Sequence, residues 1–187
     1  MKTINSPFFC ETEEKRSRFL AFLMPYPEYE GELARLRTEH PKANHHVSAF
    51  RYFDADKRLH EGAKDDGEPS GSAGMPALKF LQGEDLVNVA VIIVRYFGGI
   101  KLGTGGMARA YGGAAKAVID VADLQTFNHQ ATATFTANFD RTSDLERLLQ
   151  ATNITDRRYT ESGIEIDISD DEEIVEGLEE QWERINY

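Results

Sequence analysis

The stretch LVNVAVIIVRYFGGIKLGTGGMARAYGG, residues 86–113, decides how the first part of this chain folds. Residues 86–97 are rich in Val and Ile, which predicts a strand buried on both faces. Residues 98–106 predict a glycine loop, and residues 107–121 predict a helix. A strand that leads through a glycine loop into a helix can bind an anion, because unpaired backbone N–H groups and the helix dipole meet there.

Basic side chains in this stretch could strengthen anion binding through charge-assisted hydrogen bonds to phosphate or carboxylate. They are Arg95, Lys101 and Arg109. Glycines would form the framework of the loop: Gly98, Gly99, Gly103, Gly105 and Gly106. The run is not a P-loop, since no Gly-Lys-Ser/Thr follows the glycines. It matches the Gly-x-Gly-x-x-Ala pattern of dinucleotide-binding folds only weakly, because the strand ends too early.

A second glycine-rich segment, DDGEPSGSAGMP, occupies residues 65–76. All but its last residue lies in residues 54–75, which show no periodicity and predict one long loop. Loops of that length inside a compact domain are usually functional. We expect Asp65, Asp66, Gly67 and Glu68, together with His45 on the preceding strand, to bind a ligand or partner. The alternative is a solvated cluster of turns.

The same region offers side chains that zinc or manganese accepts. These are His45, His46, His60, Asp65, Asp66 and Glu68. Adjacent residues of a strand point to opposite faces, so His45 and His46 cannot both face one site. No His-x-x-x-His or Cys-x-x-Cys spacing is present, and we expect no metal site and no cofactor. The alternative is a metal-dependent phosphohydrolase or a nucleotide-dependent enzyme that uses Asp65, Asp66 and Glu68.

The remaining segments predict an α+β protein of two domains, residues 1–125 and 128–187. In the first, residues 5–12, 18–24 and 45–53 predict strands, and two segments predict helices, residues 28–39 and 76–81. In the second, the order is strand, helix, strand, strand, helix. Ser143 to Glu146 read SDLE, which predicts a capping box at the start of its first helix.

Charge is distributed unevenly between these two parts. Residues 1–124 hold 16 basic and 17 acidic side chains, whereas residues 125–187 hold 5 and 15. The second part would repel a nucleic-acid backbone, so a phosphate-bearing partner must meet the first part. A basic protein could instead be the partner of the acidic part.

Composition also indicates the cellular compartment of the protein. The single cysteine, Cys10, cannot form an intramolecular disulfide, which fits a reducing compartment. The N-terminal residues lack the apolar core of a signal peptide, and no apolar run is long enough to span a bilayer. We expect a cytoplasmic protein with no membrane partner.

Three blocks of this sequence resemble the IMPACT/YigZ family: ANHHVSAF (residues 43–50), DDGEPSGSAGMP, and VIIVRYFGGIKLGTGGMARAYGGA (residues 91–114). The resemblance implies a first domain similar to the second domain of a small-subunit ribosomal protein. It also implies that the second domain is ferredoxin-like and similar to a domain of elongation factor G. Eukaryotic relatives act in translational control, which implies a translation-linked binding role.

The sequence therefore predicts a non-enzymatic binding protein linked to translation or its regulation. Its glycine-rich, cationic loop would contact RNA, the ribosome or a translation factor. A single site requires the acidic loop and the cationic loop to meet in space, and the sequence alone leaves that open.

Overall fold

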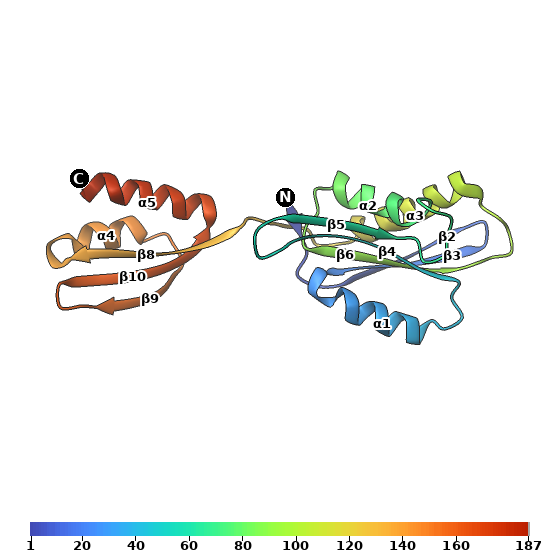
Figure 1. Cartoon of the computed structure of the whole chain (residues 1–187), viewed down its shortest axis with the longest axis horizontal. Helices are drawn as coiled ribbons and strands as arrows, with labels where there is room; N and C mark the ends of the chain where they lie inside the picture. The colour runs from blue at the N-terminus through green and yellow to red at the C-terminus, as the bar shows by residue number, and fades with distance from the viewer. Residues whose placement is uncertain (187) are drawn as a thin grey trace. The chain divides into compact units, whose positions relative to one another are not determined.

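The computed structural model describes residues 1–186. The chain divides into two units, Met1–Phe127 and Asn128–Tyr187, each with its own hydrophobic core. The fold is mixed, with helices and sheets in both units (Figure 1). No helix in the described part of the chain is long and apolar enough to cross a membrane.

The first unit is built on a five-stranded antiparallel sheet in the order β2-β3-β6-β4-β5. Its strands are β2 (Phe8–Glu14), β3 (Ser17–Pro25), β4 (His45–Phe53), β5 (Leu59–Lys64) and β6 (Val89–Tyr96). A separate two-stranded ribbon pairs β1 (Lys2–Thr3) with β7 (Gln125–Thr126). Because β6 is the central strand, its residues are buried on both faces up to Arg95, as its Val- and Ile-rich sequence predicts.

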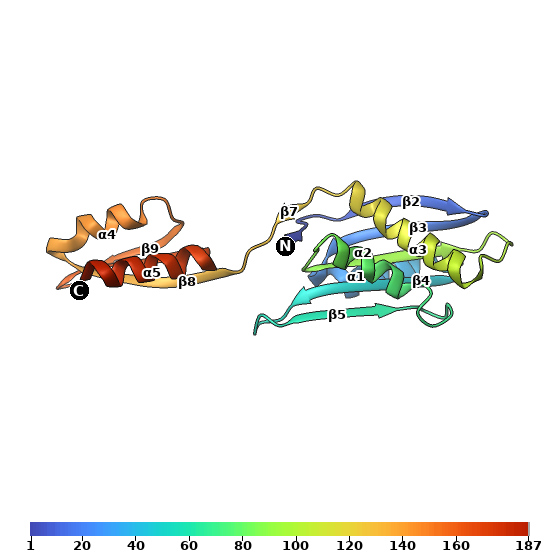
Figure 2. The same cartoon turned by 90° about the horizontal axis from the view of Figure 1, so that it is seen from above.

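Helices cover both faces of this sheet (Figures 1 and 2). A 3₁₀ turn, η1 (Tyr26–Glu28), leads into α1 (Tyr29–Glu39), which lies on one face. The opposite face is covered by α2 (Gly74–Gly83) and α3 (Gly103–Asp120). Gly112 lets α2 and α3 approach closely, since a Cβ there would lie 2.8 Å from the ring of Phe80.

Two expectations for this unit were wrong. The long loop predicted over residues 54–75 contains β5, which pairs with β4 from Phe53↔Leu59 to Ser48↔Lys64. This strand lies at the sheet edge and is mostly exposed, so its sequence lacks the alternation that marks a half-buried strand. The helix expected from residue 107 begins earlier, at Gly103, and includes glycines that have low helix propensity.

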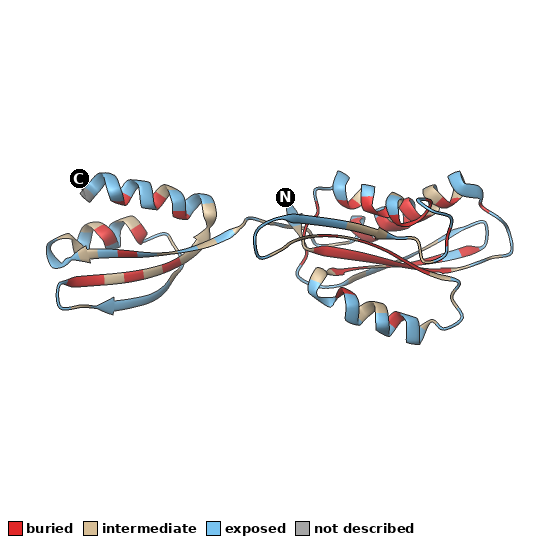
Figure 3. Cartoon of the chain, viewed as in Figure 1, coloured by how far each residue is buried: buried red, intermediate tan, exposed pale blue. Residues whose placement is uncertain are grey.

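The second unit folds in the order β8 (Gln130–Asn138), α4 (Thr142–Leu149), β9 (Ile154–Tyr159), β10 (Gly163–Asp171) and α5 (Glu172–Asn186). The strands pair antiparallel in the order β8-β10-β9. Both helices pack on one face of this sheet, and buried residues alternate with less buried ones along β10 (Figure 3). The predicted capping box is absent: α4 begins at Thr142, and no side chain caps it.

Candidate functional site

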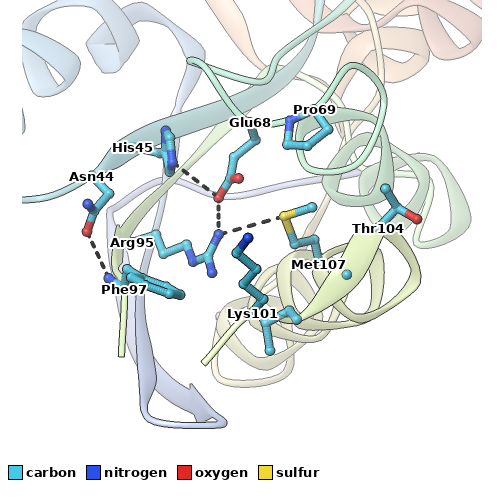
Figure 4. A pocket seen from close by; sticks show the side chains of 11 residues that line it. Asn44, His45, Glu68, Pro69, Arg95, Phe97, Lys101, Thr104 and Met107 are labelled. Atoms are coloured by element: carbon cyan, nitrogen blue, oxygen red, sulfur yellow. Dashed lines mark hydrogen bonds and ion pairs between the residues drawn. The ribbon is translucent and has the colours of Figure 1, made fainter. Parts of the chain in front are cut away.

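The acidic loop and the glycine loop of the first unit meet around one cavity (Figure 4). We call residues 65–73 the carboxylate loop and residues 97–102 the glycine loop. The cavity has a volume of about 440 Å³ and lies between these loops, the start of β4, the end of β6 and the first turns of α3. Of the predicted site residues, His45, Glu68, Arg95, Lys101 and Gly103 line it.

A buried ion pair between Glu68 and Arg95 joins the carboxylate loop to the end of β6. The side chains are 5% and 6% exposed, and Arg95 Nη1 donates to Glu68 Oε1. The Tyr111 hydroxyl of α3 donates to the same oxygen at 2.7 Å, and His45 Nε2 lies 3.6 Å from it. Burial and the hydrogen bond to Glu68 raise the pKa of Tyr111, so this hydroxyl remains a proton donor at neutral pH.

Arg95 belongs to the wall of the cavity and is not the surface cation that its place beside the glycine loop suggested. Its guanidinium lies 5.6 Å from the ring centroids of both Phe19 and Phe97. Nη2 approaches the Ser17 hydroxyl at 3.5 Å, the outer limit of a hydrogen bond. Within residues 1–186, Arg95 Nε is buried without an acceptor.

Asp65 holds the shape of the carboxylate loop and does not line the cavity. Its carboxylate accepts N–H groups from Gly71 at 2.8 Å, Ala73 at 3.1 Å and Gly74 at 2.8 Å. Gly74 is the first residue of α2, so the Asp65 charge also lies at the start of that helix, where the helix dipole favours it.

Asp66 ties the same loop to α1 and β4. It accepts the His46 N–H at 2.6 Å and an Arg37 N–H at 2.7 Å. Partial burial alone would raise the pKa of Asp66, but the bonds from Arg37 and His46 lower it overall. The neighbouring Gly67 is exposed, and a Cβ there would lie 3.5 Å from the ring of His45.

The histidines of this region have separate surroundings. His45 lines the cavity and donates through its Nδ1–H to the Asp66 carbonyl oxygen at 2.8 Å. His46 lies on the other face, where its Nε2 is 3.3 Å from the Leu36 carbonyl oxygen and burial lowers its pKa. His60 pairs with Asp54 on the β4–β5 hairpin. No cluster of three or more metal-binding side chains occurs among the described residues.

The glycine loop packs on the turn between β2 and β3. A Cβ on Gly98 would lie 2.1 Å from the carbonyl carbon and oxygen of Arg16, so only glycine fits there. This packing brings Lys15 and Arg16, both exposed, to the same end of the sheet as Lys101. Neither cation was predicted as a site residue; the signal was the charged turn EEKRS between two predicted strands.

The start of α3 contributes backbone donors. A helix leaves its first N–H groups without intrahelical acceptors, and no side chain caps α3. Gly103 and Thr104, in this first turn, line the cavity, and Gly103 has a φ of +71° that favours glycine. Gly99, Gly105 and Gly106 lie beside the cavity in the glycine loop and α3 and do not line it.

Arg109 faces a different surface. It lines a second hollow of about 400 Å³ between α2 and α3, together with Pro76, Lys79 and Phe80. The structure therefore does not bring Arg109 and Lys101 to one cavity, although both side chains are exposed.

Comparison with known proteins places this site in a family domain. Residues 15–119 match the family model of the Impact N-terminal domain. An IMPACT family member of Haemophilus influenzae is 45% identical over 105 residues, a match that covers 54% of this chain and only 51% of that protein. The IMPACT family member YigZ of Escherichia coli is 35% identical over 147 residues, covering 77% of this chain and 72% of that protein.

A solved structure supports the fold of the whole chain. The crystal structure of a hypothetical protein superposes with a TM-score of 0.66 at 28% sequence identity, covering 95% of this chain and 88% of that one. The family model spans more than half of the chain and includes every residue of the cavity. The chain therefore belongs to the IMPACT family.

Proposed function

We propose that this chain is a non-enzymatic binding protein that acts in translation or its regulation. Its contact surface is the end of the first unit formed by the β2–β3 turn, the glycine loop and the start of α3. The partner is RNA, presented as such or within the ribosome. The role in translation rests on membership of the IMPACT family, since eukaryotic members of that family act in translational control.

One observation carries the proposal: three exposed cations and free backbone donors lie at one end of the first unit, in which residues 1–124 hold 16 basic and 17 acidic side chains in all. Lys15, Arg16 and Lys101 are exposed, and within the described residues none of them has an ion-pair partner. The uncapped first turn of α3 adds N–H groups at the same end. Phosphate contacts of this kind supply most of the affinity of sequence-independent nucleic-acid binding.

The geometry supports binding over the alternative metal enzyme. Asp65 accepts three backbone N–H groups, Asp66 accepts two donors, and Glu68 is paired with Arg95. Each carboxylate thus has a structural partner.

Co-sedimentation with ribosomes across a salt series tests the proposal. The test variant reverses two surface charges, Arg16→Glu with Lys101→Glu, and the matched control reverses two exposed charges away from the cavity, Arg58→Glu with Lys79→Glu. We expect wild type and control to bind at low salt with a steep salt dependence. Each lost phosphate contact should reduce the slope of log K against log salt by about 0.7 to 0.9. Equal binding by the double variant and the control would contradict the proposal.

A further inference from the structure

The wall of the cavity contains a buried guanidinium whose hydrogen bonding is incomplete. Arg95 has five N–H donors. Its hydrogen-bond acceptors in the described chain are Glu68, the Met107 sulfur at 3.7 Å and the Ser17 hydroxyl at 3.5 Å. The Nε–H has no acceptor there. Buried donors of native proteins are nearly always satisfied. Arg95 lines the cavity, which favours a ligand that carries hydrogen-bond acceptors.

The start of α3 independently favours an anion at the same place. Gly103 and Thr104 belong to the uncapped first turn of α3 and line the cavity, so the positive end of the helix dipole lies at this wall. Lys101 lines the same wall and is exposed, whereas the charge of Arg95 is balanced by Glu68. The cavity thus carries net positive charge next to free donors.

The rest of the wall is apolar and partly aromatic. Phe97 is 46% exposed and lines the cavity beside the buried Arg95, as Figure 4 shows. Pro69, Leu102 and Met107 complete this side. The volume of about 440 Å³ falls in the range of small-molecule sites. Inorganic phosphate alone would leave the apolar part of such a cavity empty.

We propose that this cavity binds one nucleoside phosphate, with the base against Phe97 and the phosphate at Lys101 and the first turn of α3. Exposed aromatic rings stack with bases, and helix starts bind phosphates, so the two halves of the wall match the two halves of a nucleotide. Asn44 and Thr104 supply side-chain polar groups at the rim. The inference rests on the proposed function where it takes the nucleotide to be the end of an RNA strand; a free nucleotide has the same chemistry.

Calorimetry with the full chain tests the inference with four kinds of probe. These are the nucleoside 5′-monophosphates, the matching nucleosides, inorganic phosphate, and a short single-stranded RNA with a 5′-phosphate. Backbone amide shifts in NMR locate binding at Gly103 and Thr104. Phe97→Ala is the test variant, and Phe9→Ala, an exposed phenylalanine of β2, is its matched control.

We expect a monophosphate or the RNA end to shift the amides of the first turn of α3. The matching nucleoside and inorganic phosphate should each bind at least about tenfold more weakly, and Phe97→Ala should weaken nucleotide binding about tenfold. Phosphate binding as tightly as the nucleotide, no amide shift at millimolar nucleotide, or no effect of Phe97→Ala would overturn the inference.

The two proposals can fail separately. Ribosome association that is lost in the Arg16/Lys101 variant, without nucleotide binding in the cavity, overturns the inference and leaves the proposed function standing. Binding of free monophosphates without ribosome or RNA association supports the inference and contradicts the proposed function. Tighter binding of the RNA end than of the monophosphate identifies RNA as the source of the nucleotide.

Discussion

The two units use charge in opposite ways. In the first, Glu68 and Arg95 are buried together beside a cavity, and Asp65 and Asp66 hold a loop in place. In the second, a larger excess of acid is exposed, and ion pairs such as Arg158–Asp167 lie at the surface of a sheet covered on one face. A charge removed from water must be paired or it destabilises the fold, whereas a solvated charge can be lost cheaply. The charged residues of the first unit therefore hold a cavity and a loop in shape, whereas those of the second unit lie in solvent.

The largest effect should come from breaking the buried pair. Glu68→Gln leaves the Arg95 charge uncompensated, and we expect the first unit to lose about 3 to 5 kcal/mol of stability. Trp182, the single tryptophan, lies in the core of the second unit and reports on that unit alone by fluorescence. Urea unfolding should show an earlier transition by backbone amide signals of β6 and an unchanged tryptophan midpoint. A shift of both transitions by the same amount would mean that the units do not unfold separately.

A smaller effect is expected where a charge organises backbone. Asp65→Ala removes the acceptor of three N–H groups and should cost about 2 to 3 kcal/mol. The amide protons of Gly71, Ala73 and Gly74 should then exchange with solvent faster, while those of β6 keep their protection. Unchanged exchange at these three amides would show that the loop holds its shape without Asp65.

The contribution of Asp66 should depend on pH. Its pKa is lowered in the folded state by Arg37 and His46, so its stabilisation is fully present above the unfolded-state pKa of about 3.9. That stabilisation is lost as the pH falls through the lower, folded-state pKa. Asp66→Asn should therefore cost roughly 2 kcal/mol at pH 7 and progressively less as the pH falls below the unfolded-state pKa of about 3.9. Urea titrations at pH 7 and at a series of acid pH values check this; a loss that stays equal at every pH would indicate a steric effect.

The smallest effect is expected in the second unit. Asp167→Asn breaks contacts with Arg158 and Thr134 that lie at the surface. Solvent screens such pairs, so the tryptophan midpoint should move little. A loss comparable to that of Glu68→Gln would remove the contrast between the two units.

Removing the second unit tests where binding resides. A chain ending at Phe127 keeps the complete core of the first unit and its cavity. We expect it to retain association with ribosomes and to lose any basic protein partner held by the acidic unit. Loss of ribosome association in this variant would assign that contact to the second unit.

The sequence predicted the elements whose pattern reflects burial. Val and Ile along β6 and the alternation of β8 follow directly from what each strand packs against. The edge strand β5 and the glycine-rich start of α3 were missed, because exposure removes alternation and glycines favour a loop prediction. The pattern of apolar residues along the sequence therefore does not reveal an exposed strand at the edge of a sheet.

The site was predictable in its loops and not in the roles of its side chains. The glycine and carboxylate motifs identified the segments that enclose the cavity. The pairing of Glu68 with Arg95 joins residues far apart in the chain, and the approach of Arg16 to Gly98 depends on the alignment of β3 with β6. Such contacts arise from tertiary packing, which is why Arg95 was taken for a surface cation and Lys15 and Arg16 were overlooked.

Hydrogen exchange of the full chain, with and without ribosomes, tests the central claim most directly. The account predicts slower exchange in residues 14–17 and 97–106 when ribosomes are present, and unchanged exchange throughout β8, β9 and β10. Slower exchange confined to the second unit, with residues 97–106 unaffected, would contradict it.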